Sequence, residues 1–297
     1  MRCWEHSDSK QWYYFAAPVA ALLASFATVF AGRIWSQNIS AGSCSYRHAF
    51  SPYGTAFAIW SLIYLWCDVA NAVQVAPVLL KTSNAYGNLC VSFAWILCAT
   101  WIYLFDPYHK MSIAVAGIVL PAACVLCTVG VTLDDECWKD SEAVLLFLVP
   151  NSLLAGWLLV ASTLALSTSF QVVSGVEPAC LVPGDTSLET RAKRRERNRR
   201  GHPYAEAYRR QSLVPPLLSV GVSAVSAFVL KNPIYPLPAA WAILNMGPWG
   251  VRPDTNDVSP YPFHKGWKYP WWSYLPSVVL LLSASGWAGY GIWRVDR

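Results

Sequence analysis

Residues 112–131 read SIAVAGIVLPAACVLCTVGV, a block of twenty residues without a charged side chain. An α-helix rises 1.5 Å per residue, so such a block is long enough to cross the hydrocarbon core of a bilayer, which is about 30 Å thick. Similar blocks recur along the chain, and charged residues reappear between them. The pattern predicts an all-α fold, a polytopic transmembrane helical bundle.

The composition agrees with a membrane protein. Only 13% of the 297 residues are charged, against roughly 25% in an average soluble domain. The net charge of +5 does not indicate nucleic-acid binding, because nine of the 22 Lys and Arg residues lie between Arg191 and Arg210. The basic charge therefore follows the connections between spans.

The apolar stretches predict eight spans, at 13–32, 53–76, 87–105, 112–131, 143–173, 212–230, 234–247 and 274–293. The seventh is short and contains Pro236 and Pro238, so seven spans with one re-entrant segment is the alternative. The predicted organisation is an N-terminal tail (1–12), a five-span core (13–173), a basic loop (174–211) and spans six to eight (212–297).

The basic loop sets the expected orientation. More Lys and Arg lie on its side of the membrane than on the other, which places the loop in the cytoplasm and both termini outside it. Read alone, residues 191–200 resemble a nucleic-acid patch. Between two spans such a cluster more often determines topology or contacts anionic lipid headgroups. We therefore expect an integral, multi-pass protein whose partners include the bilayer and no nucleic acid; no motif assigns a particular membrane.

The second predicted span carries an aromatic and polar face. Six of its residues fall within an arc of about 80° at 100° per residue: Tyr53, Phe57, Trp60, Tyr64, Asp68 and Asn71. Lipid tails disfavour carboxyl and amide groups, so this face is expected to point into the bundle. For Asp68, the acidic residue deep in a span, two interpretations remain: a carboxyl that joins helices, or an anchor for a ligand's polar group.

The tryptophans fall into two sets. Trp12, Trp35, Trp271, Trp272 and Trp293 lie at span ends, where an aromatic belt is normal. Trp60, Trp66, Trp95, Trp101 and Trp157 lie deeper. A buried indole needs a partner for its N–H and offers a flat apolar surface for a planar ligand, although plain packing is the alternative. In the fifth span Pro150 leaves a backbone carbonyl without its helical donor, and a kink there could open a pocket.

Two blocks carry a family resemblance. Ser51-Pro-Tyr-Gly-Thr-Ala-Phe-Ala-Ile-Trp-Ser-Leu-Ile-Tyr64 resembles the second-helix signature of the tryptophan-rich sensory protein and translocator protein family (TspO/MBR). Pro150, Gly156-Trp157 and Ala161 look like its fifth-helix block, and Trp101 is a weaker match. Residues 239–244 are similar to a late helix of extended, eight-span relatives. Two departures are Ala165, where the family usually has Asn, and the long basic loop.

The resemblance implies a TspO-like five-helix core with about three additional C-terminal spans. It further implies an aromatic-lined cavity that binds tetrapyrroles such as porphyrin or haem, or sterols, with a translocator or sensory role; homodimers are common in the family. Ala165 changes the expected polarity of the site. Together with the helix geometry, the predicted ligand-binding set is Pro52, Gly54, Phe57, Trp60, Tyr64, Asp68, Asn71, Trp95, Trp101, Pro150, Trp157 and Ala161.

Catalysis is not expected. The sequence has no HExxH, GxGD or GxSxG pattern, and Cys124-x-x-Cys127 lies mid-span, where packing is the usual role. No metal site and no required cofactor are predicted; a haem would be a ligand, with an axial bond conceivable from His48, His109, His202 or His264. The remaining alternatives are a secondary transporter or receptor of another class, and a structural membrane subunit.

Overall fold

The structure is a computed structural model, and it describes residues 11–45, 58–75, 85–106, 109–132, 141–174, 205–245 and 275–295. Every regular element in these ranges is helical. The helices are α1 (Gln11–Ser45), α2 (Ala58–Val75), α3 (Ala85–Leu104), α4 (Lys110–Thr132), α5 (Ser141–Ala143), η5 (Val144–Leu148, a π-helix), α6 (Val149–Val173), α8 (Ala205–Val229), α9 (Leu237–Leu244) and α11 (Leu275–Val295). The all-α prediction is confirmed.

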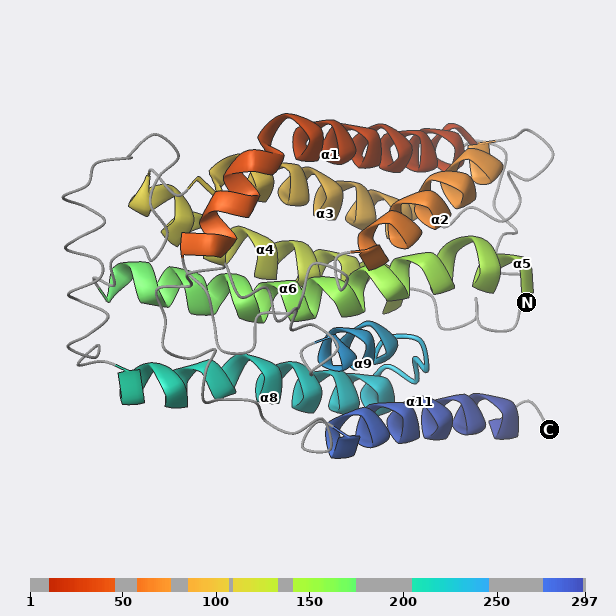
Figure 1. Cartoon of the computed structure of the whole chain (residues 1–297). Helices are drawn as coiled ribbons and strands as arrows, with labels where there is room; N and C mark the ends of the chain where they lie inside the picture. The colour runs from red at the N-terminus through yellow and green to blue at the C-terminus, as the bar shows by residue number, and fades with distance from the viewer. Residues whose placement is uncertain are drawn as a thin grey trace.

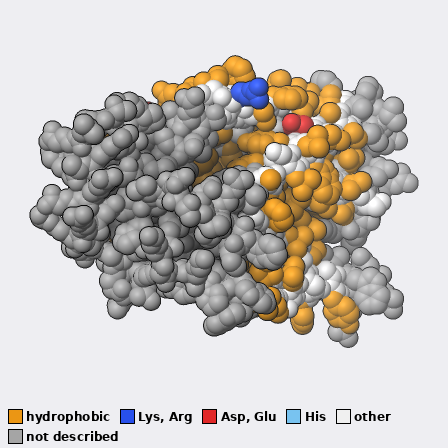
Figure 2. Space-filling model, in the orientation of Figure 1, with side chains coloured by type: hydrophobic (Ala, Val, Ile, Leu, Met, Phe, Trp, Pro, Cys, Tyr) orange, Lys and Arg blue, Asp and Glu red, His pale blue; other side chains and the backbone are white. Residues whose placement is uncertain are grey.

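The first five predicted spans are present as helices that are long and apolar enough to cross a membrane. Figure 1 shows α3, α4 and α6 running alongside one another, with α1 and α2 on one side and α8, α9 and α11 on the other. Large hydrophobic side chains such as Phe30, Leu65 and Ile118 are exposed, and Figure 2 shows hydrophobic side chains across the described face of the molecule. Such a surface suits lipid contact.

Two helices extend beyond the apolar stretches that predicted them. α1 continues to Ser45, through a kink at Trp35 with φ −103° and ψ 17°. α8 begins at Ala205, so the last residues of the predicted loop 174–211 are helical. Hydropathy detects only the part of a helix that lies in lipid, and Glu, Arg and Gln are good helix formers outside it. The loop 174–211 therefore overlaps the start of α8, and its bounds as a connection between two spans stay a prediction.

The C-terminal part does not confirm three further full spans. α9 has eight residues, a length of about 12 Å, which cannot cross a core of about 30 Å. The segments Leu217–Val229 and Ser277–Tyr290 are apolar but shorter than the five main spans. The proline-containing stretch 234–247 therefore favours the re-entrant alternative.

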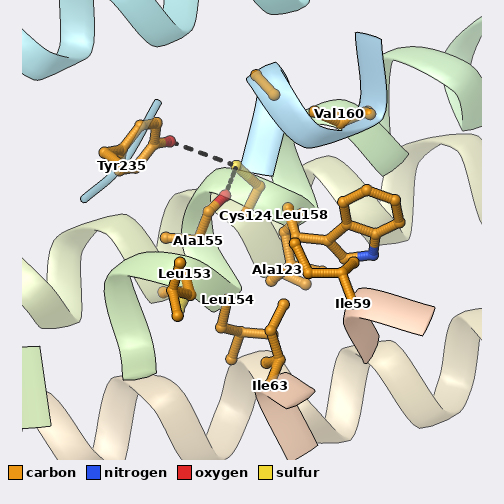
Figure 3. Packing of buried hydrophobic residues seen from close by; sticks show 14 of the residues in the cluster. Ile59, Ile63, Ala123, Cys124, Leu153, Leu154, Ala155, Leu158, Val160 and Tyr235 are labelled. Carbon is orange, nitrogen blue, oxygen red and sulfur yellow. Dashed lines mark hydrogen bonds between the residues drawn. The ribbon is translucent and has the colours of Figure 1, made fainter. Parts of the chain in front are cut away.

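The C-terminal helices share one hydrophobic core with the first five spans. Tyr235, in the turn between α8 and α9, is 2% exposed, and its hydroxyl lies 3.1 Å from Thr128 Oγ1 and 3.9 Å from Cys124 Sγ on α4. Figure 3 shows the ring of Tyr235 pointing toward Cys124, whose thiol donates to the Ala155 carbonyl. Tyr235 therefore joins the turn to α4, and Cys124 joins α4 to α6.

Candidate functional site

The deepest part of the bundle contains an aromatic cluster, which we define as Trp60 and Tyr64 of α2, Trp95 of α3 and Trp157 of α6. Trp60 stacks on Tyr64 with 5.3 Å between ring centroids, and Tyr64 stacks on Trp95 at 5.0 Å. Trp157 meets Trp60 edge-on at 6.1 Å. Three helices distant in sequence thus contribute to one aromatic surface, as the mid-depth tryptophans suggested.

Helical spacing places these rings together. Trp60 and Tyr64 are four residues apart and share a face of α2. The α3 backbone is fixed beside them, because Thr28 Oγ1 donates to the Trp95 carbonyl oxygen at 2.8 Å. Trp95 is 0% exposed and Trp157 is 1% exposed, whereas Trp60 and Tyr64 are half-buried. The four rings contact one another in the region where the sequence predicted a cavity.

The other two mid-depth tryptophans lie outside this cluster. Trp66 donates its indole N–H to the Leu145 carbonyl oxygen at 3.2 Å, which joins α2 to η5. Trp101 packs on Phe105 with 5.1 Å between ring centroids, near the end of α3. The five tryptophans that the sequence grouped by depth therefore have different surroundings.

Several buried polar atoms near the cluster have no hydrogen-bond partner. These are the donors Asn71 Nδ2, Trp95 Nε1 and Trp101 Nε1 and the acceptor Asn88 Oδ1. Most buried polar groups in proteins are paired, and leaving one unpaired costs about 1–3 kcal/mol. Of these four atoms, Trp95 Nε1 belongs to the aromatic cluster itself.

Asp68 connects two helices. Its Oδ1 accepts a hydrogen bond from Ser25 Oγ of α1 at 2.5 Å, and Ser25 is fully buried while Asp68 is half-buried. A carboxyl inside a membrane requires such a partner, since lipid provides none. The contact supports the interpretation of Asp68 as a helix-joining group; its role as a ligand anchor stays a prediction.

Pro150 has a different effect from the pocket-opening kink that we considered. Proline has no N–H, so the carbonyls one turn before it lack a helical donor, and η5 lies there. Gln74 Nε2 of α2 donates to the Leu146 carbonyl oxygen at 2.8 Å. Asn88 Nδ2 of α3 in turn donates to Gln74 Oε1 at 2.8 Å. The Leu146 carbonyl thus connects η5 to α2 directly, and to α3 through Gln74.

Gln74 and Asn88 also belong to this region, although the sequence patterns did not predict them. Both are 0% exposed, and Gln74 lies one turn after Asn71 on α2. The polar arc counted on the second span ended at Asn71. Extending the arc by one turn, and noting an Asn in the first turn of the third span, would have identified both side chains.

The rest of the predicted set has mixed outcomes. Ala161 packs against the main core and Pro150 is buried, while Ala165, at the usual Asn position, is also buried. Pro52, Gly54 and Phe57 lie outside the described residues, as do His48, His202, His264 and the basic stretch 191–200. Contacts of that stretch with anionic lipid, and homodimerisation, stay predictions.

No metal or thiol chemistry is indicated within the described ranges. They contain no group of three or more His, Cys, Asp or Glu that could hold a metal ion. His109 is exposed and its Nδ1 lies 2.8 Å from Asp106 Oδ2. Cys124 and Cys127 are free thiols whose sulfurs contact the carbonyls of Ala155 and Asn151, as expected for packing.

The five long apolar helices and their shared core define an integral membrane protein with a helical-bundle fold of the TspO type. The model of the TSPO-like protein family matches residues 11–177, more than half of the chain. The chain belongs to this family. Comparison with curated proteins and with solved structures found no match in either set.

Proposed function

We propose that this protein binds a flat hydrophobic ligand, either a tetrapyrrole such as porphyrin or haem or a sterol, between α2, α3 and α6, and acts in its translocation or sensing. The observation that carries the proposal is the indole N–H of Trp95, which is fully buried inside a stacked aromatic cluster and has no hydrogen-bond partner. Membership of the TSPO-like family supports the same site.

The chemistry of the cluster suits such a ligand. Stacked and edge-on rings can exchange one aromatic neighbour for another planar body at little cost, since each ring pair contributes only about 0.5–1.5 kcal/mol beyond its buried area. An acceptor on the ligand would also satisfy Trp95 Nε1. Trp60 and Tyr64 are the half-buried members of the cluster, so we expect entry from the α2 side, with Trp60 moving first.

The proposal is tested by equilibrium binding to purified protein in detergent. Protoporphyrin is followed by quenching of tryptophan fluorescence, and cholesterol by a radiolabelled assay. Micromolar Kd values are expected for at least one ligand, and Trp157→Phe is expected to weaken binding about tenfold, equivalent to about 1.4 kcal/mol. Trp287→Phe is the matched control, because Trp287 is 67% exposed on α11. Absence of saturable binding by the wild type would refute the proposal.

One observation favours a second function, that of a structural membrane subunit. The four rings already fill their own space, as core residues do. If packing is their whole purpose, Trp157→Phe lowers thermal stability and neither ligand raises the Tm of the wild type. A ligand-dependent rise in Tm that Trp157→Phe diminishes would instead support the binding site.

A further inference from the structure

A second, polar site lies beside the aromatic cluster, between α2 and α3. Two side-chain contacts join these helices: Tyr64 with Trp95, and Gln74 with Asn88. Residue numbers rise along α2 while they fall along α3, so the helices are antiparallel here. Asn71 lies seven residues after Tyr64, and Asn88 lies seven residues before Trp95. Seven residues are two helical turns, so each Asn faces the same way as its aromatic partner.

Asn71 on α2 and Asn88 on α3 are therefore expected to face each other. They lie about 10 Å along the helices from the Tyr64–Trp95 contact. They are 2% and 0% exposed. Asn71 Nδ2 is a donor without an acceptor, and Asn88 Oδ1 is an acceptor without a donor. The two atoms are complementary, yet they do not bond to each other. Both atoms would be satisfied by one group that accepts from Asn71 Nδ2 and donates to Asn88 Oδ1.

The orientation of the Asn88 amide follows from the chain of hydrogen bonds that begins at Leu146. The Leu146 carbonyl oxygen can only accept, so Gln74 presents its Nε2 to it. Gln74 Oε1 is then the atom that accepts, and Asn88 must present Nδ2 to it. This leaves Oδ1 as the free atom of Asn88, and a flipped amide would set two acceptors against each other. Pro150 thus determines the polarity of a site two helices away.

We infer that Asn71 and Asn88 form a hydroxyl-binding subsite for a flat apolar alcohol whose ring body lies on the aromatic cluster. The inference rests on the proposed function and selects among its ligands. A hydroxyl accepts from Asn71 Nδ2 and donates to Asn88 Oδ1. A carboxylate or a ketone can satisfy only Asn71, because it has no proton for Asn88. An alcohol of sterol type therefore fits this subsite better than the carboxylates of a porphyrin.

The test compares sterols that differ in one polar group. Cholesterol is expected to bind the wild-type protein about tenfold more tightly than 4-cholesten-3-one, which has a ketone in place of the hydroxyl, and more tightly than its 3α-epimer. In Asn88→Leu, which removes the acceptor for the hydroxyl proton, this preference is expected to fall to within twofold, while a cooperative thermal unfolding transition shows that the variant is folded. Asn245→Leu, the same change at the end of α9, is expected to keep the preference.

The outcomes separate the two proposals. If protoporphyrin binds but the wild-type protein binds the alcohol, the ketone and the epimer with equal affinity, the subsite is refuted. A bound water would then be the group between Asn71 and Asn88. The same conclusion follows if folded Asn88→Leu retains the tenfold preference. If neither sterol nor protoporphyrin binds, the proposed function is itself wrong and the subsite with it. The wild-type comparison of epimers decides the matter even if Asn88→Leu fails to fold.

Discussion

The aromatic cluster and the junction between α6 and the C-terminal helices lie in the same hydrophobic core, yet they differ in how their polar groups are satisfied. At the junction Tyr235 bonds Thr128, and Asn232 Nδ2 donates to Ser152 Oγ at 2.7 Å. Beside the aromatic cluster, Asn71 and Trp95 keep buried donors without partners. Pairing of this kind is typical of a structural contact, whereas the unpaired donors of Asn71 and Trp95 are the feature on which the proposed ligand site rests.

The largest effect is expected from filling the junction. A Cβ added at Gly156 would lie 2.1 Å from the Tyr235 carbonyl oxygen, so Gly156→Ala must displace the turn that carries Tyr235. We expect a loss of about 3 kcal/mol in the free energy of unfolding, measured by thermal denaturation in detergent. Gly221→Ala is the control, because its Cβ meets nothing within 4 Å. A Gly156→Ala protein as stable as Gly221→Ala would contradict the close packing of the junction.

The next effect tests the chain of hydrogen bonds from Leu146 to Asn88. Gln74→Leu removes the donor to the Leu146 carbonyl and the acceptor of Asn88 Nδ2, leaving two buried groups unpaired. The expected cost is about 2 kcal/mol. Trp66→Phe, which removes one donor from the neighbouring Leu145 carbonyl at a more exposed place, should cost less than half as much. Equal losses in the two variants would show that Gln74 is not a central link.

A pair of conservative changes compares the two regions directly. Tyr235→Phe removes a paired hydroxyl and is expected to lower stability by about 1 kcal/mol without changing ligand affinity. Trp95→Phe removes an N–H that is already unpaired, so the ligand-free protein should lose less from hydrogen bonding, while binding weakens severalfold. The measurements are the free energy of unfolding and the ligand Kd of each variant. If Trp95→Phe leaves affinity unchanged, the unpaired indole is not a ligand contact.

Much of this contrast was foreseeable from helix periodicity, and part of it was not. The 3.6-residue repeat placed Trp60, Tyr64 and Asn71 on one face of α2, because the direction of a side chain around a helix depends on sequence local to that helix. The partner of Gln74 depends on a π-helix and a proline more than 70 residues away, which hydropathy does not encode. The stretch that contains α9 was left open between a span and a re-entrant segment for the same reason, since composition does not report whether an apolar stretch crosses or folds back.

The smallest effect on stability is expected at Asp68, and it decides between the two interpretations of that residue. Asp68→Asn retains an acceptor for the Ser25 hydroxyl, so the free energy of unfolding should change by less than about 1 kcal/mol, whereas Ser25→Ala removes the contact and should cost about 1 kcal/mol. If Asp68 only joins α1 to α2, both variants bind ligand as the wild type does. If Asp68→Asn instead loses ligand affinity while its stability is retained, Asp68 is a ligand contact. The ligand site would then extend from the aromatic cluster to the interface between α1 and α2.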